Sequence, residues 1–171
     1  HADALLSGVP GIAAPAFVDF DDDALAAGVR DGHRRLRRAL RRALARPGDE
    51  AAMHRFRQAA RLHWLQLELL QSAGPAVLAP LAAEVKKLSQ MLGAERDLHL
   101  LAACLRRRRA PASGSMQRGE VLSAIDARRA DLRRRAMRLG AVVCAEGSRA
   151  FATRVLAMRA ALLATGPARP P

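Results

Sequence analysis

Apolar residues recur along this chain at the three- and four-residue spacing of a helix, and no segment alternates as a half-buried strand would. The pattern predicts five helices, over residues 23–46, 49–72, 77–109, 116–146 and 148–164. The connections between them are short, which favours antiparallel neighbours. We therefore predict an all-α fold, an antiparallel up-and-down bundle of four to five long helices.

Residues at the predicted helix ends support these bounds. Asp49 is a suitable N-cap for the second helix, because its carboxylate can accept a hydrogen bond from a free backbone N–H. Pro80 is placed in the first turn of the third helix, where a missing N–H costs little. Gly147 is interpreted as the C′ glycine of the fourth helix, and Ser148 as the N-cap of the fifth.

The first helix carries an apolar stripe between two rows of arginines. The stripe consists of Leu25, Val29, Leu36, Leu40 and Leu44. One row holds Arg30, Arg34, Arg37 and Arg41, and the other holds Arg35, Arg38, Arg42 and Arg46. Like charges at this spacing repel, and few carboxylates are close in sequence to offset them. The rows therefore suit an anion, although periodicity leaves open which row faces it.

In the second helix, basic residues lie directly beside the core stripe. Met53, Phe56 and Ala60 form an apolar column, and His54, Arg57 and Arg61 form a second column next to it. A histidine in this place can pack in the core or bind a ligand. A guanidinium beside a core needs a partner, and its planar fork matches phosphate oxygens.

Charge is concentrated in parts of the chain, and its net value is +13. Residues 30–64 hold 11 basic and 3 acidic residues, and residues 106–138 hold the same numbers. Such an excess predicts a polyanionic partner. On the fourth helix, Arg129 and Arg133 fall on or next to the apolar side, where a groove between helices would lie.

Several function classes lack support in the sequence. Cys104 and Cys144 form no CxxC pattern and are interpreted as reduced thiols, and no apolar run reaches membrane-spanning length. No metal-binding, nucleophile, phosphate-loop or paired-carboxylate motif occurs, so we expect no cofactor, no metal and no catalysis. The first twenty residues lack the features of a signal peptide, and we expect a flexible leader and a cytoplasmic protein.

Two motifs together resemble the CHAD domain, the conserved histidine α-helical domain. His54-x-x-Arg57-x-x-x-Arg61 is similar to the motif of that family's second helix, and LGAERDLHLL, starting at Leu92, is similar to the motif of its third. The resemblance extends over about residues 26–163. Gln58, Leu62, Trp64 and His99 depart from the residues usual in the family.

The resemblance implies non-catalytic binding of inorganic polyphosphate by basic residues on helices, in some members at polyphosphate granules. The proposed ligands are His54, Arg57, Arg61, Arg34, Arg37, Arg41, Arg96, Arg129 and Arg133, with Asp97 as an orienting residue. His54 either contacts phosphate or fixes the packing that aims Arg57 and Arg61. The alternative function is non-specific nucleic-acid binding by the same charge.

The resemblance also bears on domain organisation and assembly. The family's domain has two similar helical halves, whereas this chain shows one, so residues 21–165 are interpreted as a single half or minimal version. Residues 166–171 are expected to form a disordered tail. Two copies related by a two-fold axis would restore both halves, which makes a homodimer a hypothesis.

Overall fold

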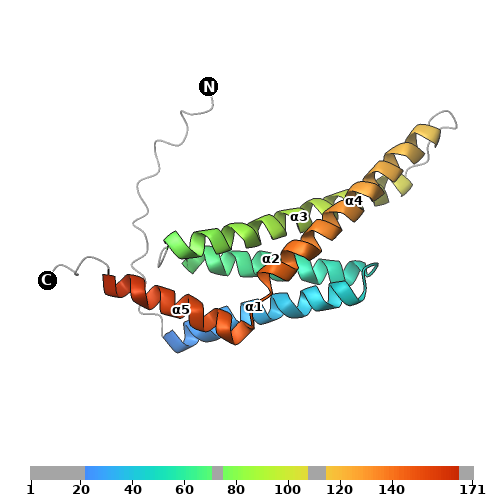
Figure 1. The fold of residues 1–171 in the computed structure, drawn as a ribbon. Helices are drawn as coiled ribbons and strands as arrows, with labels where there is room; N and C mark the ends of the chain where they lie inside the picture. Colours follow the sequence, from blue (N-terminus) through green and yellow to red (C-terminus); the bar gives the residue numbers. More distant parts are fainter. Residues whose placement is uncertain (1–21, 71–74, 108–114, 166–171) are drawn as a thin grey trace, which may run out of the picture.

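The computed structural model describes residues 22–70, 75–107 and 115–165, which form five α-helices and no strand. The helices are α1 (Asp22–Ala45), α2 (Glu50–Leu70), α3 (Pro75–Arg107), α4 (Ser115–Val143) and α5 (Ser148–Thr165) (Figure 1). The all-α prediction is therefore confirmed. The expected leader and tail lie outside the described residues, as do the predicted ends of the second and third helices. No helix in the described part is long and apolar enough to cross a membrane.

The core consists of two clusters of buried side chains, and helices α1 to α4 form the first of them. Helix α2 packs against α1 and α3, α3 also packs against α4, and α4 returns to α1. Leu36, Phe56, Leu88 and Ala136 bring one side chain from each helix into this cluster, and all four are fully buried. The helices approach closely, since a Cβ added at Gly140 of α4 would lie 2.8 Å from Cζ of Phe56.

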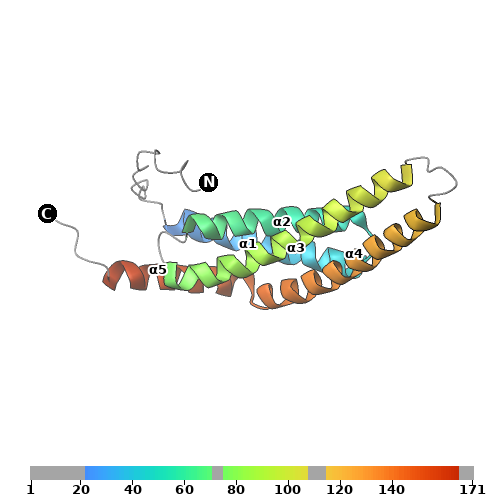
Figure 2. The ribbon, with the colours of Figure 1, turned by 90° about the horizontal axis from the view of Figure 1, so that it is seen from above.

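In the second cluster of the core, α5 packs against the first three helices, as α4 does in the first cluster. Here Val29, Leu67 and Val85 of the first three helices pack with Phe151 of α5. In both views α5 continues in the direction in which α4 ends, so it does not turn back along α4 (Figures 1 and 2). The expectation of antiparallel neighbours is therefore wrong for this pair, because the four-residue connection only offsets the two helices.

The connection between α4 and α5 also differs from its prediction. No described glycine has a positive φ, so Gly147 is not a left-handed C′ residue. Its carbonyl accepts a hydrogen bond from the N–H of Phe151 at 2.9 Å, which makes Gly147 the N-cap of α5. Ser148 is thus the first residue of the helix, and its hydroxyl contacts Nδ1 of His33 on α1 at 3.1 Å.

At the other helix starts one prediction is confirmed and one is corrected. Oδ1 of Asp49 accepts hydrogen bonds from the N–H groups of Ala51 (2.9 Å) and Ala52 (3.1 Å), as expected of an N-cap. Helix α3, however, begins at Pro75, so Pro80 lies beyond its first turn. The start of the helix uses the earlier proline, whose fixed φ suits the first helical position.

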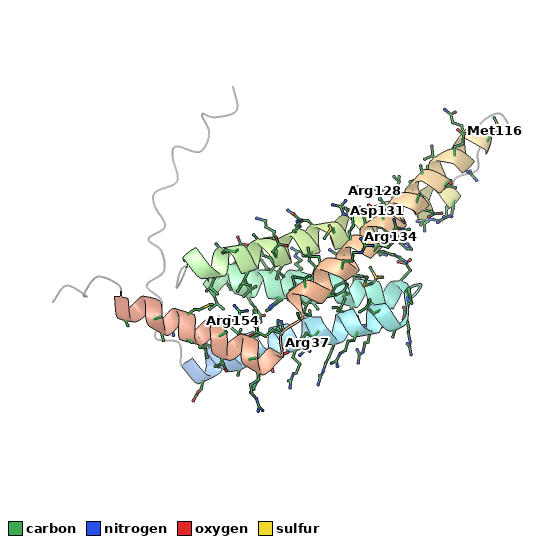
Figure 3. The ribbon with its side chains drawn as sticks, in the orientation of Figure 1. Arg37, Met116, Arg128, Asp131, Arg134 and Arg154 are labelled. Carbon is green, nitrogen blue, oxygen red and sulfur yellow. The ribbon has the colours of Figure 1, made fainter. Side chains whose placement is uncertain are left out.

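The C-terminal end of α3 and the N-terminal end of α4 project together beyond the other helices, and we call this pair of ends the hairpin (Figures 1 and 2). Met116, labelled near its tip in Figure 3, is 80% exposed. Val121 of α4 is 45% exposed in this projecting part. Leu44, in the last turn of α1, was placed in the apolar stripe but is 50% exposed.

Candidate functional site

Three of the predicted ligands meet between α2 and α3. His54 and Arg57 of α2 line a small cavity together with Arg96 of α3. Its volume of about 10 Å³ is close to the space of one water molecule. Nε of Arg57 is buried there without a hydrogen-bond partner. The second-helix motif and the third-helix motif therefore converge, but the space between them is no channel for a chain of phosphates.

The other members of this predicted set point elsewhere or lie in the open. His54 is exposed, which removes the interpretation of a packed core histidine. Arg61 is exposed one turn along α2 and does not line the cavity. Asp97 is exposed and forms no hydrogen bond or ion pair with Arg96 or any other described residue. Its orienting role stays a prediction.

Arg129 and Arg133 of α4 contact acidic residues of the protein itself. Nη2 of Arg129 donates to Glu50 Oε1 at 2.8 Å and to Glu95 Oε1 at 2.9 Å. Nε of Arg133 donates to Glu95 Oε1 at 2.8 Å, and its Nη2 donates to Glu50. Nδ1 of His99 accepts a hydrogen bond from Arg129 at 2.8 Å, since a guanidinium can only donate. We call this set of residues the α4 network: Arg129, Arg133, Glu50, Glu95 and His99.

The α4 network is largely removed from water. The carboxylate of Glu95 is 4% exposed, and the side chains of Arg129 and Arg133 are 12% and 19% exposed. Burial raises the pKa of Glu50, but the hydrogen bonds from Arg133 and Arg129 outweigh it and leave this pKa below its usual value. Burial by itself would lower the pKa of Arg133, but Glu50 and Glu95 together outweigh this effect. The pKa of Arg133 therefore lies above its usual value. Both arginines are therefore already neutralised by carboxylates.

The predicted row on α1 is divided among three surroundings. Arg34 forms an ion pair with Asp31 at 2.9 Å. Arg37 is half-buried near the α4–α5 connection, where its charge counteracts the rise of the Cys144 pKa to about 11 that burial causes (Figure 3). Arg41 is exposed and lines a pocket at the α1–α2 turn. This row thus provides no continuous surface.

Three arginines of the second α1 row, Arg35, Arg38 and Arg42, line an open space beside α2, and Arg46 lines the pocket next to it. We call the space between α1 and α2 the α1–α2 groove; Arg35, Arg38 and Arg42 line it from α1 and Arg55 lines it from α2. It has a volume of about 450 Å³ and continues through Arg42 and Arg55 into a pocket of about 620 Å³ at the turn.

The second α1 row has no counter-charge among the residues that the structure describes. Arg35, Arg38, Arg42 and Arg46 form no ion pair with a described residue, and Arg55 comes only within 4.0 Å of Asp49. In Figure 3, side chains ending in nitrogen project from the outer side of α1, away from α4. The sequence offered one signal for this surface, the absence of carboxylates close to this row. It could not show that α2 lies alongside it.

Two buried histidines were not singled out by the sequence. His33 and His63 are fully buried, with ring centroids 5.5 Å apart, and His33 stacks on Phe151 at 4.2 Å. Nε2 of His33 donates to the Val143 carbonyl at 3.3 Å. Burial, with a smaller effect of the neighbouring His33, lowers the pKa of His63 to about 4. Both imidazoles are neutral at pH 7, and they join α1 and α2 to the start of α5.

A comparison with protein families matches residues 2–106 to the CHAD domain. This chain belongs to the CHAD domain family. The match covers α1, α2 and nearly all of α3, and therefore includes both motifs that carried the resemblance. Helices α4 and α5, also assigned to the resemblance, lie outside the match. No curated protein and no solved structure matches the chain.

Membership places the protein among binding domains. CHAD domains are generally associated with polyphosphate and are generally non-catalytic. In this CHAD domain, no group of three or more His, Cys, Asp or Glu side chains that could hold a metal ion occurs in the described residues. The family thus gives a ligand class, and the arrangement of charges shows where such a ligand could be accommodated.

Proposed function

We propose that this CHAD domain binds inorganic polyphosphate without catalysis, chiefly through the α1–α2 groove. One observation carries the proposal: the α1 wall of the groove is lined by arginines that have no carboxylate partner among the described residues. A polyphosphate chain would supply the missing negative charge, and each guanidinium can donate two parallel hydrogen bonds to phosphate oxygens. His54, Arg57, Arg61 and Arg96 would then extend the contact from the far side of α2.

The absence of catalysis is part of the proposal. Phosphoryl transfer usually needs carboxylates that hold Mg²⁺ beside the phosphates. No acidic residue lines the α1–α2 groove, and Asp49 alone lines the pocket next to it. Glu50 and Glu95 are engaged in the α4 network. The basic surface is therefore suited to holding a phosphate chain and poorly suited to cleaving it.

The test is a comparison of two double variants with equal loss of charge. We expect Arg38→Ala with Arg42→Ala to weaken binding of long-chain polyphosphate about tenfold or more. Arg134→Ala with Arg138→Ala, on α4 and outside the α1–α2 groove, should weaken it by about threefold or less. Affinities would be measured by titration at fixed salt. Equal losses would mean that net charge alone attracts the ligand and that the groove is not a site.

A third double variant tests the site expected from the sequence. Arg57→Ala with Arg61→Ala should also weaken polyphosphate binding more than the control pair on α4 does. Neither guanidinium forms an ion pair with a described residue, so a phosphate chain along α2 would supply their counter-charge. A loss no larger than that of the control pair would confine the site to the α1–α2 groove.

Nucleic acid is the competing ligand for the same charges. No aromatic side chain besides His63 lines the groove, so successive bases would find no stacking surfaces. We therefore expect long-chain polyphosphate to displace DNA from the protein in a competition assay. Displacement of polyphosphate by DNA at equal phosphate concentration would favour a nucleic-acid-binding function.

We further propose a homodimer, and a cytoplasmic location at polyphosphate granules. Support for the dimer comes from the projecting hairpin, which exposes Leu100, Leu101, Met116 and Val121. Two such hairpins could form one four-helix bundle across a two-fold axis. Light scattering with and without polyphosphate tests the dimer directly, and a monomer in both conditions would exclude it.

Fluorescence microscopy of the tagged protein in cells with and without polyphosphate tests the proposed location at granules.

A further inference from the structure

The two walls of the α1–α2 groove differ in chemistry. The α1 wall carries arginines along its whole length. The α2 wall carries Arg55 at the end near the turn and then only uncharged residues. These residues are Gln58, Ala59, Leu62, His63 and Gln66. A chain made only of phosphates would match the first wall and Arg55, and would leave the rest of the second wall without a suitable partner.

The uncharged end of the groove is shaped by a close contact between the helices. A Cβ added at Gly32 of α1 would lie 1.8 Å from Oε1 of Gln66, so only glycine leaves room for this carboxamide. Oε1 also lies 3.5 Å from Nδ1 of the buried His63, whose Nε2 is buried without a partner. Because Oε1 faces the neutral imidazole, the amide N–H groups of Gln66, a residue that lines the groove, are left as donors for a ligand.

The α2 wall has the features of a site for a flat heterocycle. Leu62 is 56% exposed and offers an apolar surface in the groove. Gln58 and Gln66 lie two helical turns apart on either side of it, and carboxamides pair with the donor and acceptor edges of nucleobases. This surface suits a single base, because one apolar platform with flanking amides gives no place for the next.

The length of the groove suits a ligand with a base at one end and phosphates at the other. Gly32 and Arg42 are ten residues apart on α1, which corresponds to about 15 Å along the helix. The volume of about 450 Å³ falls in the range of small-molecule sites. Arg38, Arg42 and Arg55 lie toward the end near the turn, where a triphosphate would extend.

We infer that the α1–α2 groove binds a nucleoside polyphosphate, with its phosphates on Arg38, Arg42 and Arg55 and its base on Leu62 beside Gln66. The inference rests on the proposed function, since it uses the same arginines for the phosphates. It adds a second ligand class, for which the uncharged part of α2 provides the selectivity. A nucleotide and the end of a polyphosphate chain would then compete for the same arginines.

The test compares ATP and GTP with inorganic tripolyphosphate by calorimetry at one salt concentration. A nucleoside triphosphate carries no more negative charge than tripolyphosphate, so charge alone predicts equal or weaker binding. We expect at least one of the two nucleotides to bind about tenfold more tightly. Equal affinities for all three ligands would overturn the inference and leave the proposed function intact. If the protein bound neither tripolyphosphate nor long-chain polyphosphate, the proposed function itself would be contradicted.

A pair of glycine variants tests the uncharged end without removing an arginine. Gly32→Ala forces the Gln66 carboxamide out of its place, whereas a Cβ at Gly28 on the same helix would have nothing within 4 Å. Gly32→Ala should lower nucleotide affinity about tenfold and change tripolyphosphate affinity by about twofold or less. Gly28→Ala should change neither. Equal effects of Gly32→Ala on both ligands would contradict the inference.

Leu62→Lys gives a second readout at an exposed position that does not endanger folding. A new cation in the groove should strengthen tripolyphosphate binding, because it adds a phosphate contact. It should weaken nucleotide binding, because it removes the apolar surface beneath the base. Opposite signs are expected only if the base lies on this wall. Stronger binding of both ligands would show that the groove recognises phosphates alone.

Discussion

Arginines on two sides of the bundle have opposite surroundings. In the α4 network, each arginine contacts both Glu50 and Glu95 and is nearly buried. In the second α1 row, each arginine is exposed and forms no ion pair with a described residue. The same residue type thus stabilises the fold in one place and remains available to a ligand in the other. Net charge and helical periodicity do not separate these two roles, because the partner carboxylates come from different helices.

The largest expected effect comes from breaking the α4 network. Glu95→Leu removes the buried carboxylate that Arg129 and Arg133 share, and these two side chains are only 12% and 19% exposed. We expect the free energy of unfolding to fall by about 3 kcal/mol, measured by chemical denaturation. The matched control is Glu84→Leu, an exposed glutamate on the same helix, which should change it by about 0.5 kcal/mol or less. Similar losses in both variants would mean that the network adds nothing.

The second-largest expected effect is a loss of stability in acid. It is expected from the buried histidines and not from Glu50 of the α4 network. An unfolded histidine takes up a proton near pH 6.5, whereas His63 in the fold does so only near pH 4. The unfolded state therefore binds more protons between these values, and stability falls as pH falls through this window. We expect a loss of about 2 kcal/mol between pH 8 and pH 5 from His63 alone.

Variants identify the source of this acid sensitivity. The pKa of Glu50 is held below its usual value by Arg133 and Arg129, so this carboxylate stays charged between pH 8 and pH 5. His63→Gln should flatten the dependence of unfolding free energy on pH between 8 and 5. His54→Gln, an exposed histidine on the same helix, should leave it unchanged. An unchanged slope in His63→Gln would assign the acid sensitivity to another group.

The smallest effect on stability is expected in the second α1 row, where the effect on binding is large. Arg38→Ala with Arg42→Ala should change the free energy of unfolding by about 0.5 kcal/mol or less, since exposed arginines without partners hold nothing together. The same variant should reduce the salt dependence of polyphosphate affinity by about 1.4 in log–log slope, by analogy with single-stranded nucleic acid. A marked loss of stability would show that these side chains belong to the fold after all.

Local pattern was sufficient for the helices and for one face of α2. Met53, Phe56 and Ala60 are buried as their spacing predicts, and Asp49 caps the helix as its place before a helical segment predicts. His54 and Arg57 do lie together beside this stripe and meet Arg96 of the next helix. These features depend on the geometry of one helix, or on two helices joined by a short connection. Residues near one another in sequence therefore determine them.

Contacts between distant helices decided the rest. Arg129 meets Glu50 across 79 positions, and His33 meets Ser148 across 115, so no spacing along the chain could indicate either pair. Which α1 row faces α2 depends on the rotation of one helix against the other, which is set by how the whole core packs. By itself the sequence determined five helices, their apolar stripes and a strongly basic chain. The tertiary structure decided which arginines are neutralised by carboxylates and which remain for an anion, because only packing brings opposite charges from separate helices within hydrogen-bonding distance.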